Sequence, residues 1–276
     1  MALDPERYVI GDDGLWVEKV GSWAREKLDI VADYVQITSA ARRRFAHNNP
    51  AFIDVFSGPG RSLVRSDGAF IDGSPVAAFK QGLNSLQPFS TIHISDLEPS
   101  LLTAATERLE KLNAPVVATP GPAAQAIEQI VSSLNPHGLH FALLDPHNLG
   151  SLSFSIIKRL AKLKSVDILV HVSVLDLQRN TDLYSSELQE QFDEFAPGWR
   201  QHVSREQNLV AFRAALISYW SDLLEGVSMP RARHEQLIRG EANQRLYWLM
   251  LLSKHPLAHE LWEKITSVAR QPRMLF

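Results

Sequence analysis

A glycine-containing turn and two acidic positions are the residues of this sequence best suited to binding and chemistry. Gly58-Pro59-Gly60 follows the short apolar run 51–56 (AFIDVF), and a glycine lets a ligand approach the backbone where a Cβ would clash. Asp96 follows a second apolar run, and Asp145-Pro146-His147 follows a stronger one. Carboxylates placed after such runs are suited to hold the hydroxyl or amine groups of a ligand.

Short apolar runs alternate with helical patterns through the middle of the chain. The predicted strands are 51–56, 91–95, 115–119, 139–144 and 166–175, and the predicted helices are 75–83, 99–112, 125–134 and 154–163. This alternation is typical of a parallel, doubly wound α/β sheet. Ligands of such sheets bind beyond the carboxyl ends of the strands, so the residues that follow each strand are expected to share one cleft.

The two ends of the chain show other patterns. Residues 15–46 predict one or two amphipathic helices, which gives a helical N-terminal extension over residues 1–50. The main domain would then cover residues 51–276, with a helical insertion at about 178–226. The last hundred residues predict a helix at 208–224, strands at 234–239 and 245–253, and a closing helix at 258–269. The two late strands are expected to form an antiparallel hairpin at the sheet edge.

The glycine turn departs from the dinucleotide-binding fingerprint. Leu63 occupies the place of the third glycine, and Asp96 lies farther along than the roughly 20 residues typical of a nicotinamide site. A glycine turn with a ribose-binding carboxylate but no third glycine suits an adenosine ligand without a diphosphate. S-adenosylmethionine is the leading candidate, and a tight turn that binds no ligand remains the alternative.

Six residues follow as candidate cofactor ligands. Asp54, beside the turn, is expected near the methionine amino group, and Asp96 is expected on the ribose hydroxyls. The full candidate set is Asp54, Ser57, Gly58, Gly60, Asp96 and Glu98.

The Asp145-Pro146-His147 segment is the candidate catalytic motif. Proline fixes φ and has no N–H, so the chain leaves the strand in an extended form with its carbonyls toward the cleft. Asp145 and these carbonyls could together hold an amine, and His147 could stack weakly on the acceptor. The alternative is that Asp145 only caps the turn.

Other polar residues have alternative interpretations. Arg179 and Asn180 follow the fifth strand and are candidate substrate-binding residues, although a structural ion pair explains Arg179 equally well. The run Arg42–Arg44 could follow a nucleic-acid backbone, but a solvated helix end is the favoured interpretation. His255 and His259 have the spacing of a metal pair, yet Pro256 between them favours a helix start, and no metal site is expected.

Composition excludes several classes of protein. The 276 residues are 45% hydrophobic and 21% charged, which excludes global disorder. The chain has no cysteine, so disulfides, thiolate metal sites and cysteine nucleophiles are impossible. A net charge of −3 lacks the strongly basic character of a protein that coats nucleic acid. The acidic N-terminal segment and short apolar runs predict a cytoplasmic protein without membrane contact.

Several motifs in order along the chain resemble the three-Cys-motif partner (TcmP) family, whose members look like Rossmann-type methyltransferases. The resemblance covers most of the chain and rests on Trp23 with Lys27 and Tyr34, then on 52–60 (FIDVFSGPG), 73–75 (GSP), 96–99 (DLEP), 143–161, 167–180, 246–256 and 262–265. It implies a class I methyltransferase-like fold, S-adenosylmethionine as cofactor, and a three-Cys-motif protein as a candidate partner. The chain departs from the family at 145–150 (DPHNLG), where members tend to have an aromatic residue and then glycine after Asp-Pro.

Two functions therefore remain as hypotheses. The first is S-adenosylmethionine-dependent methyl transfer to an unknown acceptor, with an amine of a nucleic acid as the leading idea. The second is a catalytically inert, methyltransferase-like binding protein that acts with a three-Cys-motif protein. A nicotinamide oxidoreductase is disfavoured by Leu63 and by the predicted antiparallel hairpin.

Overall fold

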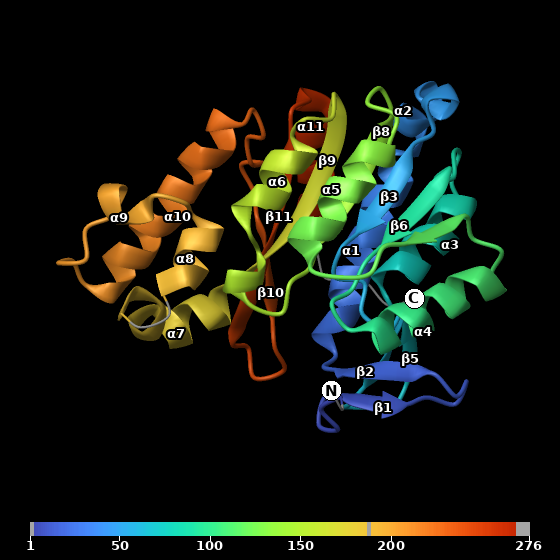
Figure 1. Ribbon diagram of the computed structural model, residues 1–276, viewed down its shortest axis with the longest axis horizontal. Helices are drawn as coiled ribbons and strands as arrows, with labels where there is room; N and C mark the ends of the chain where they lie inside the picture. The colour runs from blue at the N-terminus through green and yellow to red at the C-terminus, as the bar shows by residue number, and fades with distance from the viewer. Residues whose placement is uncertain (1–2, 187–188, 269–276) are drawn as a thin grey trace.

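A seven-stranded sheet forms the centre of the protein, here described by a computed structural model that covers residues 3–186 and 189–268 (Figure 1). Its strand order is β10-β11-β9-β8-β3-β6-β7. The strands are β3 (Ala51–Asp54), β6 (Thr91–Ile94), β7 (Val116–Ala118), β8 (Leu139–Leu144), β9 (Ser165–Ser173), β10 (Gln236–Arg239) and β11 (Arg245–Ser253). All are parallel except β11, which runs antiparallel between β9 and β10.

Two apolar clusters bury the two faces of this sheet. One face packs against α1 (Trp23–Ile37), α3 (Ser74–Leu83), α4 (Pro99–Lys111) and α11 (Pro256–Val268). The other packs against α5 (Ala123–Ser133) and α6 (Phe154–Leu160). Alternate residues of the central strands enter opposite clusters: Ile53 lies in one and Phe52 in the other. Burial on both faces explains why these strands are continuous apolar runs in the sequence.

The predicted fold class is confirmed. Each predicted strand is present, and the two late strands form the expected antiparallel hairpin, with β11 paired to β9 from Tyr247↔Ser173 to Ser253↔Asp167. The strand order, with one antiparallel strand next to the edge, is that of class I methyltransferases.

The N-terminal segment differs from its prediction. Residues predicted as the start of a helix form β1 (Tyr8–Ile10) and β2 (Trp16–Val20), and α1 begins only at Trp23. These strands join β4 (Arg61–Val64) and β5 (Phe70–Asp72) in a second sheet of order β1-β2-β4-β5. The helix expected from residue 15 is therefore wrong, because β2 pairs with a strand more than forty residues away (Glu18↔Ser62) and local periodicity cannot reveal that partner.

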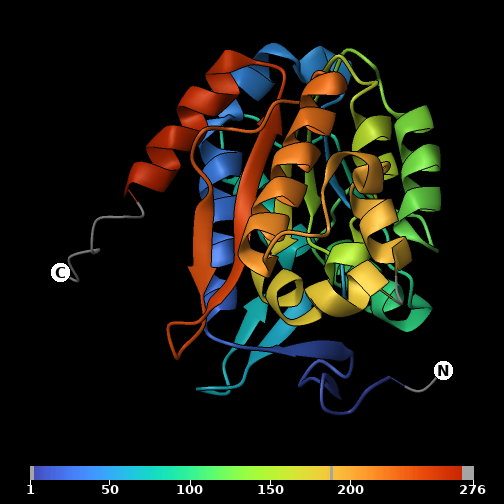
Figure 2. The same cartoon turned by 90° about the vertical axis from the view of Figure 1, so that its left-hand side faces the viewer.

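The helical insertion lies between β9 and β10. It consists of α7 (Val174–Ser186), α8 (Gln189–Phe195), α9 (Trp199–His202) and α10 (Leu209–Gly226). Its large buried residues, among them Trp199 and Trp220, extend the apolar cluster on the α5–α6 side of the sheet. Figure 2 shows α10 running beside β11. None of the helices in the described ranges is both long and apolar enough to cross a membrane.

The arginine run of the short helix α2 (Ser39–Arg44) is partly structural. Arg42 is buried, and its guanidinium donates to the carbonyls of Gln87 and Val35 and to the Ser85 hydroxyl. Arg43 and Arg44 are exposed. The interpretation as a solvated helix end is therefore wrong for Arg42, because its guanidinium satisfies backbone carbonyls inside the fold, and it holds only for Arg43 and Arg44.

Candidate functional site

A cavity of about 220 Å³ lies at the carboxyl ends of the central strands, where the sequence predicts a cleft. The glycine turn forms one wall, and residues of α1, β9 and β11 form another. Of the candidate residues, the lining contains Ser57, Gly58, Gly60, Asp145, Pro146 and His147. The structure thus brings the glycine turn and the Asp-Pro motif together.

The glycine turn has a backbone that other residues adopt only with strain. Gly58 and Gly60 have φ values of 53° and 74°. A Cβ on Gly60 would lie 3.1 Å from Cα of Ala105, and one on Gly73 would lie 2.6 Å from the carbonyl carbon of Gly60. At Gly58, by contrast, the nearest atom to an added Cβ is Glu18 Oε2 at 3.8 Å. Gly60 and Gly73 are thus required for packing, whereas Gly58 leaves space beside the turn.

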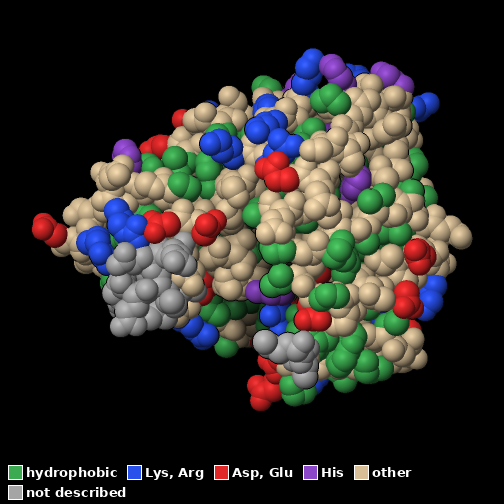
Figure 3. Space-filling view, in the orientation of Figure 1, with side chains coloured by type: hydrophobic (Ala, Val, Ile, Leu, Met, Phe, Trp, Pro, Cys, Tyr) green, Lys and Arg blue, Asp and Glu red, His purple; other side chains and the backbone are tan. Residues whose placement is uncertain are grey.

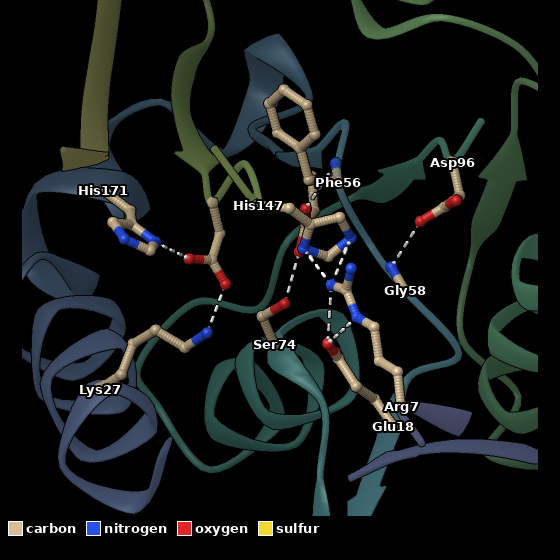
Figure 4. A network of polar contacts seen from close by, with 11 residues as sticks. Arg7, Glu18, Lys27, Phe56, Gly58, Ser74, Asp96, His147 and His171 are labelled. Carbon is tan, nitrogen blue, oxygen red and sulfur yellow. Dashed lines mark hydrogen bonds and ion pairs between the residues drawn. The ribbon is translucent and has the colours of Figure 1, made fainter. Parts of the chain in front are cut away.

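Asp96 joins the end of β6 to the glycine turn. Its Oδ2 accepts the N–H of Gly58 at 2.9 Å (Figure 4). Its Oδ1 accepts the N–H of Glu98 at 2.9 Å. Burial raises the pKa of Asp96, although both hydrogen bonds oppose this shift. The side chain is only 9% exposed and lies outside the cavity lining, as does Glu98. Asp96 has the position expected for a ribose ligand, yet it is largely covered in this conformation.

Asp54 lies beneath the turn rather than in the cavity lining. It is fully buried, its Oδ2 accepts the Ser74 hydroxyl at 2.6 Å, and its Oδ1 accepts the N–H of Phe56 at 3.0 Å. Burial raises the pKa of Asp54 to about 7, although both hydrogen bonds oppose the shift. These contacts tie the end of β3 to the start of α3 and so fix the shape of the turn.

Asp145 is the centre of a partly buried polar network. Its Oδ2 accepts a hydrogen bond from the Lys27 ammonium group, and its Oδ1 lies 2.6 Å from Nδ1 of His171 (Figure 4). Burial acts to raise the pKa of Asp145, but Lys27 and His171 together hold it well below its usual range. The carboxylate is therefore ionised at neutral pH, and both of its oxygens are engaged by this chain.

Three residues of this network were not among the candidates from the sequence: Lys27, His171 and Tyr247. The rings of His171 and Tyr247 pack with their centroids 3.9 Å apart. Among the described residues, neither His171 Nε2 nor the Tyr247 hydroxyl has a hydrogen-bond partner. The sequence held two clues to these residues: a lysine on the apolar stripe of α1 and a histidine within the apolar run of β9.

The N-terminal strands cover the outer side of the site. His147 contacts the Arg7 guanidinium, with Nε2 at 2.7 Å, and Arg7 also pairs with Glu18 at 2.9 Å. Although His147 is exposed, partial desolvation lowers its pKa, and the Arg7 charge lowers it further. Tyr8 is also buried here, and its burial and the Glu18 charge raise its pKa to about 12. His147 therefore anchors the N-terminal segment as well as lining the cavity.

The candidate substrate-binding residues lie away from the cavity. Arg179 is exposed on α7, and the Asn180 side chain donates to Asp176 Oδ1 at 2.6 Å. Asp176 in turn accepts the N–H of Leu149 at 2.8 Å, which links α7 to the loop after β8. Neither Arg179 nor Asn180 belongs to the cavity lining, and their role in binding remains a prediction.

Comparisons with known proteins find solved structures of similar fold but low sequence identity. No family model and no curated protein matches the chain. Among solved structures, TYW2 of M. jannaschii in complex with AdoMet has a TM-score of 0.45 and 8% identity, covering 92% of this chain and 88% of that one. Protein LPL1258 of Legionella pneumophila has a TM-score of 0.46 and 12% identity, with coverages of 87% and 91%. An rRNA methylase of Streptococcus thermophilus has a TM-score of 0.41 and 10% identity, with coverages of 83% and 95%.

The strand order, the antiparallel β11 and the glycine turn after β3 define the class. The chain has a Rossmann-like, class I methyltransferase fold.

Proposed function

We propose that this protein binds S-adenosylmethionine at the glycine turn and transfers its methyl group to an acceptor in the adjoining cavity. The observation that carries the proposal is the direct hydrogen bond from the Gly58 N–H to Asp96. This bond holds a glycine turn after β3 beside a carboxylate after β6, which is the arrangement that binds an adenosine in a doubly wound sheet.

The residues present fit this cofactor. Gly58 leaves open space beside the turn, so the ligand can approach its backbone. Asp96, which is 9% exposed, would accept the ribose hydroxyls after a local opening, and Asp54 would keep the turn in shape through Ser74. When bound, the cofactor supplies an activated methyl group on a sulfonium. The protein's part is to orient that group toward the acceptor and to exclude water.

The acceptor end of the cavity is formed by the Asp145 network. Because Asp145 is ionised and engaged, it would stabilise developing positive charge on the acceptor rather than take up a proton. The unpartnered Tyr247 hydroxyl and His171 Nε2 are polar groups that a small rearrangement would offer to an acceptor. An amine, as carried by a nucleic-acid base, remains the leading acceptor hypothesis.

Calorimetry with S-adenosylmethionine, S-adenosylhomocysteine and NAD tests the proposal. A ligand at 100 times its dissociation constant should stabilise the protein by about 2.7 kcal/mol in a thermal melt. We expect stabilisation by the first two ligands and none by NAD. Gly58→Val, which fills the space beside the turn, should abolish the shift. Stabilisation by NAD alone, or an undiminished shift in Gly58→Val, would contradict the assignment.

A second candidate function is a binding protein that keeps the fold without catalysis, acting with a three-Cys-motif protein. Two observations favour it: both oxygens of Asp145 are engaged within the chain, and Asp96 is only 9% exposed. The same calorimetry separates the two functions, because an inert binding protein that has lost the cofactor site would show no shift with any of the three ligands.

Replacing Asp145 by asparagine is expected to lower turnover about 100-fold while leaving cofactor affinity nearly unchanged. The substitution keeps the shape of the side chain but removes the charge that meets the acceptor in the transition state, a loss on the order of 2.7 kcal/mol. The measurement is the rate of S-adenosylhomocysteine formation, corrected for the folded fraction that circular dichroism measures. His147→Ala should lower turnover by less than Asp145→Asn does. If the parent protein is active and Asp145→Asn has the same turnover, the acceptor must bind elsewhere.

A further inference from the structure

Helix α10 has two distinct faces, and only one of them is buried in the core. Phe212, Leu216, Trp220 and Leu224 recur every four residues and are fully or almost fully buried. A second stripe, at three- and four-residue steps, lines an open groove: Val210, Arg213, Ala214, Ile217, Ser218 and Ser221. Val210 on this stripe is 74% exposed. The second face thus has apolar side chains that nothing in the described chain covers.

The groove has a volume of about 580 Å³ and lies between α7, α10 and β11, with Arg231 at its margin. Its lining contains three arginines, Arg213, Arg231 and Arg245, and no aspartate or glutamate. On the face shown in Figure 3, acidic and basic side chains are interspersed. A groove with three positive charges in a chain of net charge −3 is complementary to an anionic ligand.

The three arginines are only partly neutralised. Arg213 donates to two neutral groups, the Thr181 hydroxyl and the carbonyl of Gln178, so these contacts do not balance its charge. Arg231 has one exposed contact with Glu235 at 3.4 Å, which water screens. Among the described residues, the exposed side chain of Arg245 has no ion-pair or hydrogen-bond partner. The groove therefore presents net positive charge to a ligand.

An indole lies among these charges. Trp248 lines the groove and is half-buried, with Val174 and Ile217 as apolar neighbours in the same lining. Nucleic-acid bases stack on exposed aromatic rings, and arginine forks bind phosphates. A purely acidic peptide would use the charges but has no flat ring to place on the indole. The combination favours single-stranded nucleic acid.

Neighbouring residues of β11 line the groove and the candidate active-site cavity. Tyr247 lines the cavity and the adjacent Trp248 lines the groove, because successive residues of β11 point to opposite faces of the sheet. Similarly, His171 lines the cavity and Val174, three residues later, lines the groove. The cavity and the groove therefore lie on opposite faces of the sheet, each near the start of β11.

We propose that the groove between α7, α10 and β11 binds single-stranded nucleic acid. Arg245, Arg231 and Arg213 contact the phosphates, and Trp248 stacks on a base. This inference concerns binding alone and does not rest on methyl transfer, so the two proposals can fail separately.

The test is fluorescence anisotropy of a labelled 12-nucleotide single strand, without S-adenosylmethionine, over a series of salt concentrations. Removing one phosphate contact in Arg245→Ala should lower the slope of log affinity against log salt by about 0.7. Trp248→Leu should weaken binding about 5- to 150-fold with little change in that slope, because it removes stacking and not charge. Arg43→Ala is the matched control, since Arg43 is an exposed arginine on α2. It should leave both quantities unchanged.

Three results would overturn the proposal. One is the absence of oligonucleotide binding at low salt. Another is equal loss of affinity in Arg43→Ala and Arg245→Ala, which would indicate nonspecific charge attraction. The third is displacement of the oligonucleotide by polyglutamate at the same concentration of charge, because that would identify an acidic-peptide site. Arg245 is exposed, so its replacement should not disturb folding, and a thermal melt checks this.

Discussion

Replacing Asp96 by alanine is expected to weaken S-adenosylmethionine binding by about 10- to 150-fold. A hydrogen bond to a charged group contributes about 1.5–3 kcal/mol, and the variant loses at least one such bond to the ribose. It also loses the acceptor for the Gly58 N–H, which fixes the turn. Isothermal titration calorimetry of parent and variant measures the change in dissociation constant.

The control for Asp96→Ala is Glu110→Ala, which removes the same charge from an exposed position on α4. It should bind the cofactor as the parent does. A variant of Asp96 that remains folded and keeps the parent's affinity would show that this carboxylate does not hold the ribose, while leaving the fold assignment intact.

Replacing Lys27 by methionine is expected to lower the free energy of unfolding by about 3 kcal/mol. Methionine keeps the length of the side chain but leaves the Asp145 carboxylate without its ammonium partner, and breaking a buried pair costs about 3–5 kcal/mol. The lower end applies because the side chains of Lys27 and Asp145 keep 19% and 15% exposure and His171 still contacts the carboxylate. Chemical denaturation monitored by circular dichroism measures the loss.

A double-mutant cycle isolates this interaction. Asp145→Asn should cost much less in the Lys27→Met background than in the parent, because no buried charge is then left unpaired. The pKa of Asp145 is lowered in the folded state, so the stability it contributes is complete above the unfolded value of 3.8 and is lost as pH falls below it. The gap between parent and Lys27→Met should therefore narrow in acid. Additive effects of the two substitutions, or a gap independent of pH, would contradict the pairing.

The sequence predicted the main sheet well because its strands carry their own signal. Strands such as β8 are buried on both faces and appear as continuous apolar runs, and the residues after them meet at one edge by the geometry of parallel sheets. The meeting of Gly58 and Asp96 followed from that rule. The antiparallel hairpin was also predictable, since its two runs are close in sequence.

The small N-terminal sheet and the contacts within the site depend on partners that are distant in sequence. The strand β2 pairs with β4. The Arg108 guanidinium on α4 donates hydrogen bonds to Asp13 and to the carbonyls of Trp16 and Pro59. The Lys27 side chain reaches Asp145 across 118 positions. No local period encodes such contacts, so the small sheet, the engagement of Asp145 and the cover over Asp96 became visible only in three dimensions.

The glycine turn is the junction between the two sheets, and this position has a thermodynamic consequence. Residues 55–60 are all that separates the end of β3 from the start of β4, and β4 pairs directly with β2. A displacement of the N-terminal strands would thus act on the turn through a short backbone connection. A molecule bound at the turn and one bound on the outer side of the small sheet would be linked reciprocally: each would change the affinity of the other by the same factor.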